Sequence, residues 1–228
     1  FYMKDYFLRL NLPELSHAIE SPRKTSHECF LNWRDELIEF KNRQITRGRL
    51  VRNLLVLLVL LLRQDVKEGA PSSVQAVIHH YKLSKAEGDF LTSIENAFLS
   101  ELAQITRTRV LTDLEVFKTL KQLKTAVPGF VFVSMAFADD EKREELSEEA
   151  YRMHHSNMRS LLKAWFERGD EIIKPKLIMD GDAIMQYGGL APGPIVGELL
   201  DILEEAQFLG KIISLDDAKA LIDQQLAR

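Results

Sequence analysis

Two carboxylates separated by a single glycine come closest to catalytic chemistry in this chain. Asp180 and Asp182 flank Gly181, and paired carboxylates can hold Mg²⁺ during nucleotidyl transfer. Such a site needs its carboxylates on a strand beside a Gly-Ser turn that binds phosphate, and the sequence provides neither. We therefore expect Asp180 and Asp182 to cap the short helix that follows them.

The histidines do not form a metal-binding pattern. The adjacent pairs at 79–80 and 154–155 would point about 100° apart on a helix, so neither pair can chelate one ion simply. A metal phosphohydrolase of the HD class needs His-Asp where this chain has Gln64-Asp65, downstream of His27, and an amide is a poor substitute for imidazole. No metalloprotease, EF-hand, P-loop or nucleophile-elbow motif occurs. We expect neither a catalytic residue nor a metal site in this chain.

Basic residues are the remaining candidates for a functional surface. One group stands between two expected helices and consists of Arg43, Arg47, Arg49 and Arg52. A second group consists of Arg107, Arg109, Lys118, Lys121 and Lys124, with the three lysines recurring at every third position. Such stripes can follow a phosphate backbone without contacting bases. A solvated face, paired with acids such as Glu36 and Glu39, is the open alternative.

The charge is unevenly distributed along the chain. The net charge is −4 over 228 residues, but residues 23–124 carry 17 Lys and Arg against 12 Asp and Glu. Residues 125–228 carry 11 against 19. A polyanionic partner is therefore expected to bind the first half.

The spacing of apolar residues predicts an all-α fold. Apolar residues recur at helical intervals over nearly the whole chain, and strand-like alternation is nearly absent. The expected helices are 26–41, 47–63, 72–80, 84–99, 112–125, 127–138, 141–168, 181–187, 194–208 and 215–226. The acidic segment 139–150 divides a helical body, 1–138, which includes a degenerate HD-like region, from a smaller helical tail, 139–228.

The longest apolar run, Leu54–Leu62, is much shorter than the roughly 20 residues that span a bilayer. We expect it to form the most buried helix and expect no membrane association. The first residues lack the order of a signal peptide, and the single cysteine, Cys29, excludes an intrachain disulfide. Both features favour the cytoplasm. The oligomeric state is not predicted.

An unusual helix start occurs in the C-terminal part, where Pro192-Gly193-Pro194 is followed by Gly197. Pro194 suits the first position of a helix because its missing N–H would have no partner there. Gly193 and Gly197 leave the backbone bare, which suits either a phosphate at the helix N-terminus or close packing of another element. Both alternatives stay open.

Around this motif, the chain resembles the C-terminal part of the bacterial-type (class II) tRNA nucleotidyltransferases and poly(A) polymerases. The matching residues, in order, are Leu177, Gly181, Asp182, Gly189, Pro192, Gly193, Pro194, Gly197, Leu200, Ala206, Gly210 and Ile212. The N-terminal part agrees less specifically, through an HD-like echo at His27 and Asp65 and through the segment 81–91.

The resemblance implies a body and tail that hold the acceptor and TΨC arms of tRNA. They would present its 3′ end to a head domain that uses Mg²⁺ and CTP or ATP. Because the head motifs do not occur here, we expect a piece of a longer enzyme that is not catalytic by itself; whether the whole enzyme adds CCA, CC, A or poly(A) stays open. The expected RNA-binding residues are Arg43, Arg47, Arg49, Arg52, Lys118, Lys121, Lys124, Gly193 and Gly197.

Two other functions compete with this one. The first is a stand-alone helical module that binds RNA or another protein. The second is a degenerate HD phosphohydrolase domain, which Gln64 disfavours.

Overall fold

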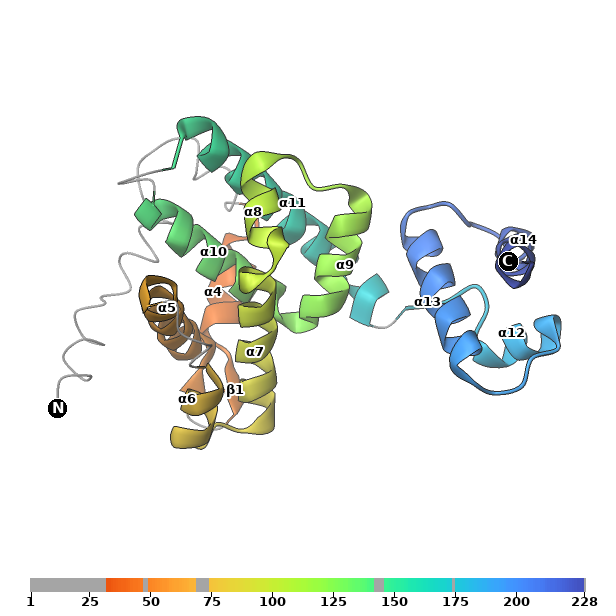
Figure 1. Cartoon of the computed structure of the whole chain (residues 1–228), viewed down its shortest axis with the longest axis horizontal. Coiled ribbons are helices and arrows are strands. Elements are labelled where there is room, and N and C mark those ends of the chain that lie inside the picture. Colours follow the sequence, from red (N-terminus) through yellow and green to blue (C-terminus); the bar gives the residue numbers. More distant parts are fainter. Residues whose placement is uncertain (1–31, 47–48, 69–73, 142–145, 174, 228) are drawn as a thin grey trace.

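The computed structural model describes residues 32–46, 49–68, 74–141, 146–173 and 175–227. Within these ranges nearly all regular structure is helical, and the strands are those of one short antiparallel hairpin. The predicted all-α class is confirmed. A multi-helix body is followed by a smaller helical tail, which extends to one side of it (Figure 1).

The body contains eight α-helices, one 3₁₀ turn and the hairpin among its described residues. In chain order they are α4 (Arg34–Asn42), β1 (Gln44–Thr46), β2 (Arg49–Leu50), α5 (Val51–Glu68), α6 (Val74–His80), α7 (Lys85–Leu99), α8 (Glu101–Thr108), α9 (Asp113–Leu123), η1 (Lys124–Ala126), α10 (Val127–Glu141) and α11 (Glu148–Ile173). From here on, the tail means α12 (Gly181–Gly188), α13 (Pro194–Phe208) and α14 (Leu215–Leu226). The division expected from the sequence, at 139–150, assigns α11 to the tail instead of the body.

Helix starts follow local capping chemistry, which is why the sequence predicts them well. At α7 the Ser84 side chain accepts a hydrogen bond from the Glu87 N–H, and the Glu87 carboxylate accepts one from the Ser84 N–H at 2.8 Å. Ser214 begins α14 with the same reciprocal arrangement. Asp180 caps α12 by accepting from the Ala183 N–H at 2.9 Å, as expected for this carboxylate. Each cap satisfies N–H groups that have no partner within the helix.

Several elements differ from the sequence-based expectation; among them, the helix expected over 141–168 is α11, which runs from Glu148 to Ile173. The helix expected from residue 47 begins at Val51, because β1 and β2 pair first and the Val51 N–H then donates to the Arg43 carbonyl at 3.0 Å. Helix α8 is not expected at all. Ser100 both ends α7 and begins α8, where its side chain accepts from the Leu102 N–H, so two helices follow each other without a loop.

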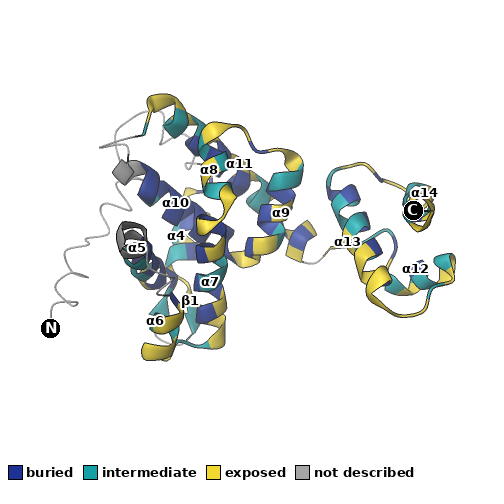
Figure 2. Ribbon diagram, in the orientation of Figure 1, coloured by how far each residue is buried: buried dark blue, intermediate teal, exposed yellow. Residues whose placement is uncertain are grey.

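Helix α10 lies at the centre of the body and contacts α4, α5, α7, α9 and α11 (Figure 2). Every residue from 126 to 135 is buried. The expectation that Leu54–Leu62 is the most buried helix is therefore wrong: Leu58 and Leu62 are fully buried, but positions 57, 60 and 61 keep partial exposure. No helix in the described ranges is long and apolar enough to cross a membrane.

A glycine allows this central packing. A Cβ atom at Gly129 would lie 2.8 Å from Ile94 Cδ1, 3.0 Å from Phe90 Cζ and 3.2 Å from Leu55 Cδ2. These distances are shorter than packed carbon atoms adopt, since their optimum is about 3.5–4.0 Å. The absent side chain thus lets α10 approach α7 and α5 closely.

The buried apolar side chains form two clusters. The larger one fills the body, and its α11 members extend to Ile172. The smaller one fills the tail and consists of Met179, Ile184, Val196, Leu199, Leu203, Ala206, Ile212, Ala218 and Ile222. Except for Phe208 and Leu209, which pack with the body cluster, the clusters separate between Ile172 and Met179. This separation lies C-terminal to the acidic segment 139–150, because α11 packs on α8, α9 and α10.

Candidate nucleic-acid interface

The described arginines of the basic segment 43–52 contact other groups of the body. Arg49 Nη1 lies 3.0 Å from Glu87 Oε2, and the Glu87 side chain is 0% exposed. Thr46 Oγ1 donates to the other Glu87 oxygen at 2.6 Å, and the Ser84 hydroxyl donates to Oε2 at 2.9 Å. Burial raises the pKa of the Glu87 carboxyl, but these hydrogen bonds and the Arg49 charge outweigh it and lower that pKa below its ordinary value. Arg49 therefore neutralises a buried carboxylate.

Arg43 and Arg52 also have partners within the body. The Arg43 guanidinium lies 4.5 Å from the Phe40 ring centroid and donates to the Thr125 carbonyl at 3.3 Å. Arg52 Nη1 donates to Asn42 Oδ1 at 3.3 Å. The remaining member of this group, residue 47, lies outside the described residues, as does His27. These contacts favour a structural role for the described arginines over the predicted phosphate contacts.

The three lysines of the second group differ from one another. Lys121 Nζ lies 2.8 Å from Asp201 Oδ1 and 2.8 Å from Glu204 Oε2, both on tail helix α13. Lys118 is exposed on α9, whereas Lys124 ends that helix with φ 48° and begins η1. Among the described residues, neither Lys118 nor Lys124 has an ion pair. The expected continuous stripe is therefore interrupted at its middle and bent at its end.

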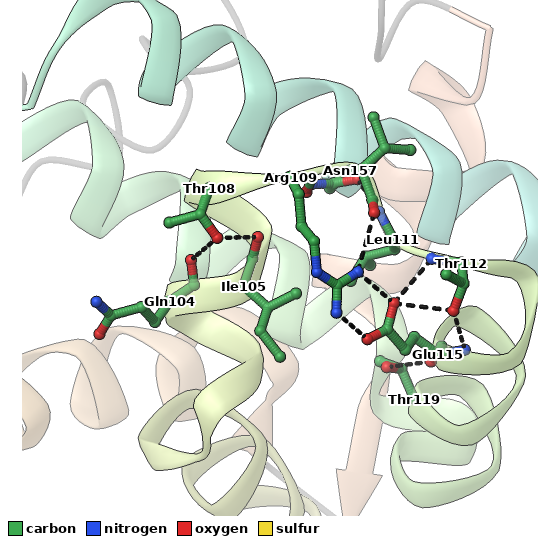
Figure 3. A network of polar contacts seen from close by, with 10 residues as sticks. Gln104, Ile105, Thr108, Arg109, Leu111, Thr112, Glu115, Thr119 and Asn157 are labelled. Atoms are coloured by element: carbon green, nitrogen blue, oxygen red, sulfur yellow. Dashed lines mark hydrogen bonds and ion pairs between the residues drawn. The ribbon is translucent and has the colours of Figure 1, made fainter.

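A polar network occupies the junction of α8, α9 and α11 (Figure 3). Arg109 Nη1 donates to Glu115 Oε2 at 2.8 Å, while its second amino group pairs with Oε1. The hydrogen bond from Arg109, followed by those from Thr112, lowers the pKa of Glu115 to about 2. Asn157 of α11 is fully buried; it donates to the Arg109 carbonyl at 2.7 Å and accepts from the Leu111 N–H at 2.9 Å. Arg109 thus organises the α8–α9 connection.

The histidine pair of α11 is buried and has no metal-binding geometry. His154 Nδ1 lies 2.9 Å from Thr106 Oγ1, and Nε2 lies 3.3 Å from the Ser134 carbonyl oxygen. Burial, with the nearby Arg107 charge, lowers the pKa of His154 to about 4, so the ring is neutral at pH 7. Within the described ranges no three His, Cys, Asp or Glu side chains are grouped as metal ligands.

The opposite face of α11 carries a basic surface that the sequence-based analysis missed. Its open face, which we define as Arg152, Ser156, Arg159 and Lys163, is exposed throughout. With 3.6 residues per turn, the three cations fall within an arc of about 40° and span about 16 Å. No acid occurs between residues 150 and 166. The overall acidity of residues 125–228 conceals this face; the 3.6-residue periodicity of the cations is the signal that would have located it.

Few acids neutralise this open face. Arg152 forms a long, exposed ion pair of 3.6 Å with Glu148. Arg159 and Lys163 have no ion pair with any residue that the structure describes. The open face of α11 therefore offers cations that are free to contact phosphates.

The start of α13 is an exposed helix N-terminus. Pro194 occupies its first position, as expected, and Gly193 precedes it with φ 175°. That φ is extended backbone open to any residue, so the backbone conformation at 193 does not require glycine. A Cβ at Gly197 would meet no atom within 4 Å. Close packing, one of the two alternatives for Gly197, is therefore absent, and the first turn of α13 stays accessible.

Two other glycines in this region do use their conformational freedom. Gly189 has φ 62° where α12 ends, and Gly210 has φ 68° just after α13. Residues other than glycine rarely adopt this left-handed backbone conformation. These two matches to the family pattern are therefore explained by helix termination.

Comparisons with known proteins do not identify a relative of this chain. No protein-family model matches it, and neither the curated proteins nor the solved structures contain a significant match.

Proposed function

We propose that this chain is the helical body and tail of a tRNA nucleotidyltransferase-type enzyme and that it binds the phosphate backbone of RNA. The observation that carries the proposal is the open face of α11, where three cations share one exposed side. Lys118 and Lys124 on the neighbouring elements α9 and η1 add two exposed cations. Most of the basic segment 43–52 is removed from the proposed interface, because its described arginines bind groups of the body.

The acceptor and TΨC arms of tRNA fit such a surface by their chemistry. Side chains cannot easily enter the deep, narrow major groove of an A-form duplex, so proteins contact its phosphates, 2′-hydroxyls and shape. Arginine and lysine on a helix provide such contacts without sequence preference. The accessible N-terminus of α13 provides a second place where backbone N–H groups favour a phosphate. Nucleotide addition would take place in a head domain, with Mg²⁺ and CTP or ATP.

A protein-interaction module is the second candidate, and exposed aliphatic side chains of the tail favour it. Ile213 is 84% exposed, and Leu215 and Ile195 are also exposed. Large apolar side chains at a surface are typical of protein contacts when they are contiguous. Ile213 and Leu215 follow the C-terminal end of α13, whereas Ile195 lies in its first turn, and we rank this function below RNA binding.

A salt titration of RNA binding tests the proposal. A tRNA transcript without its 3′ end is titrated at several salt concentrations against the wild type and the triple variant Arg152→Gln, Arg159→Gln, Lys163→Gln. Each lost phosphate contact should lower the slope of log K against log salt by about 0.9, a guide taken from B-DNA. We expect the triple variant to bind about tenfold more weakly, equivalent to about 1.4 kcal/mol.

A matched control removes three exposed cations elsewhere on the body, through Arg34→Gln, Lys82→Gln and Lys85→Gln. These residues have no ion pair within the described part of the chain, and the control should leave the salt slope unchanged. Equal slopes for wild type and the α11 variant would remove α11 from the interface. Absence of RNA binding by the wild type at low salt would reject the function and leave the protein-interaction module.

A further inference from the structure

The tail contacts the body through the last residue of α13. Phe208 is buried and belongs to the hydrophobic cluster of the body rather than to that of the tail. Its ring centroid lies 4.9 Å from that of Phe117 on α9. On its other side the Arg168 guanidinium of α11 lies 3.8 Å from the ring centroid, and Arg168 also donates to the Phe208 carbonyl at 2.7 Å. Phe208 is thus held by two helices of the body.

An ionic contact lies beside this aromatic one. Lys121 of α9 pairs with both Asp201 and Glu204 of α13, each at 2.8 Å. Positions 201, 204 and 208 recur at helical spacing, so all three lie on the side of α13 that faces the body. Asp201 is exposed and Lys121 is partly exposed, whereas Glu204 is mostly buried. Dissolved ions therefore screen this contact more than the aromatic one.

The segment that connects the two units is bound to the tail. Gln207 Oε1 accepts from the Ile178 N–H at 3.0 Å, and Gln207 Nε2 donates to the Lys176 carbonyl at 2.8 Å. Residues 176 and 178 are therefore bound to α13 through Gln207. The contacts that fix the orientation of the tail are those between α13 and the helices α9 and α11.

We propose that Phe208 and Lys121 form a two-part latch that sets the orientation of the tail on the body. Phe208 is the anchor, and its burial is insensitive to salt. The ion pairs of Lys121 are the clamp, which opens when its charges are screened or removed, so that the tail reorients about the anchor. Lys121 is a positioning residue in this account rather than a phosphate ligand. The latch is independent of whether the partner is RNA.

Distance measurements between two spin labels test the latch in the full chain. Labels are attached through Asn96→Cys on α7 and Gln224→Cys on α14, both exposed, in a Cys29→Ser background. At low salt the unmodified latch should give one narrow distance distribution. We expect Lys121→Glu to broaden it, and Phe208→Ala to broaden it further. Lys118→Glu, one turn away on the same helix, is the matched control and should leave it narrow.

A charge exchange shows whether the loss of the Lys121 ion pairs causes the broadening of the distance distribution. Adding Asp201→Lys and Glu204→Lys to Lys121→Glu re-creates attraction with reversed signs and should restore the narrow distribution. A narrow distribution in Lys121→Glu itself, or failure of the exchange to restore it, would overturn the clamp. A narrow distribution in folded Phe208→Ala would overturn the anchor; if that variant does not fold, Phe208→Leu provides the same measurement.

Discussion

The open face of α11 and the basic segment 43–52 each carry three described cations within a short stretch, but their surroundings differ. Arg49, in the basic segment, neutralises the buried carboxylate of Glu87. Arg159 and Lys163, on the open face of α11, have no ion pair within the described residues. The difference teaches that the number and spacing of cations do not determine their role. Their role depends on whether the fold places an acid or a carbonyl beside them.

The largest expected effect on stability comes from His154, on the buried side of α11. His154 should lower stability on acidification, because the unfolded chain binds its proton near pH 6.5 and the folded protein only near pH 4. Between these values the unfolded state binds more protons, so stability is present above pH 6.5 and is lost as pH falls toward 4. The total loss is about 3 kcal/mol at 1.36 kcal/mol per pH unit.

Urea unfolding at pH 7 and pH 4.5 measures this loss in the wild type and in His154→Gln, which does not titrate. The wild type should lose about 2–3 kcal/mol more than the variant over this interval. Equal losses would show that His154 is protonated in the folded protein. The inward face of α11 would then be more hydrated than its burial indicates.

Arg49→Gln should have the next largest effect on stability, and it tests whether the cations of the basic segment 43–52 stabilise the fold. It should lower the free energy of unfolding by about 2 kcal/mol, because the buried Glu87 carboxylate loses its charged partner. Denaturant unfolding of Arg49→Gln, Glu87→Gln and the double variant yields the coupling between the two residues. A coupling free energy near zero would show that Arg49 does not stabilise the fold through Glu87. Arg49 would then be a candidate for phosphate binding again.

The open face of α11 should give the smallest effect on stability. Replacing Arg152, Arg159 and Lys163 with Gln should change the free energy of unfolding by less than about 0.5 kcal/mol per site, since exposed charges contribute little. Thermal melting of each single variant measures this. A loss as large as that of Arg49→Gln would show that the face is covered, and would remove the contrast with the basic segment 43–52.

Local features of this fold were predictable because neighbouring residues produce them. The reciprocal hydrogen bonds of Ser84 with Glu87, the Asp180 cap and the position of Pro194 depend on residues at most three positions apart. The hairpin and α8 were missed for the opposite reason. The hairpin depends on pairing and on the side-chain contact of Thr46 with Glu87, which lies 41 residues away, and Ser100 serves two helices at once.

Of the candidate site, the sequence could predict which residues are basic and how they are spaced, but not which of them are free of ion pairs. The sequence identified Lys121 as basic and regularly spaced, but its partners Asp201 and Glu204 lie 80 and 83 residues further along the chain. The open face of α11 was hidden by acids elsewhere in the C-terminal half. Whether a cation is free depends on these distant contacts, which no local pattern contains.

The sequence by itself determined the helical class, most helix starts and the position of Pro194 at the start of α13, because capping and amphipathic spacing act within a few residues. Tertiary structure alone decided that α10 rather than Leu54–Leu62 is most buried. It also decided that Arg49 binds Glu87 and that Phe208 joins the body cluster. The physical reason is that burial and charge pairing depend on which distant groups the packed chain brings together, and these distances are established only when the helices pack.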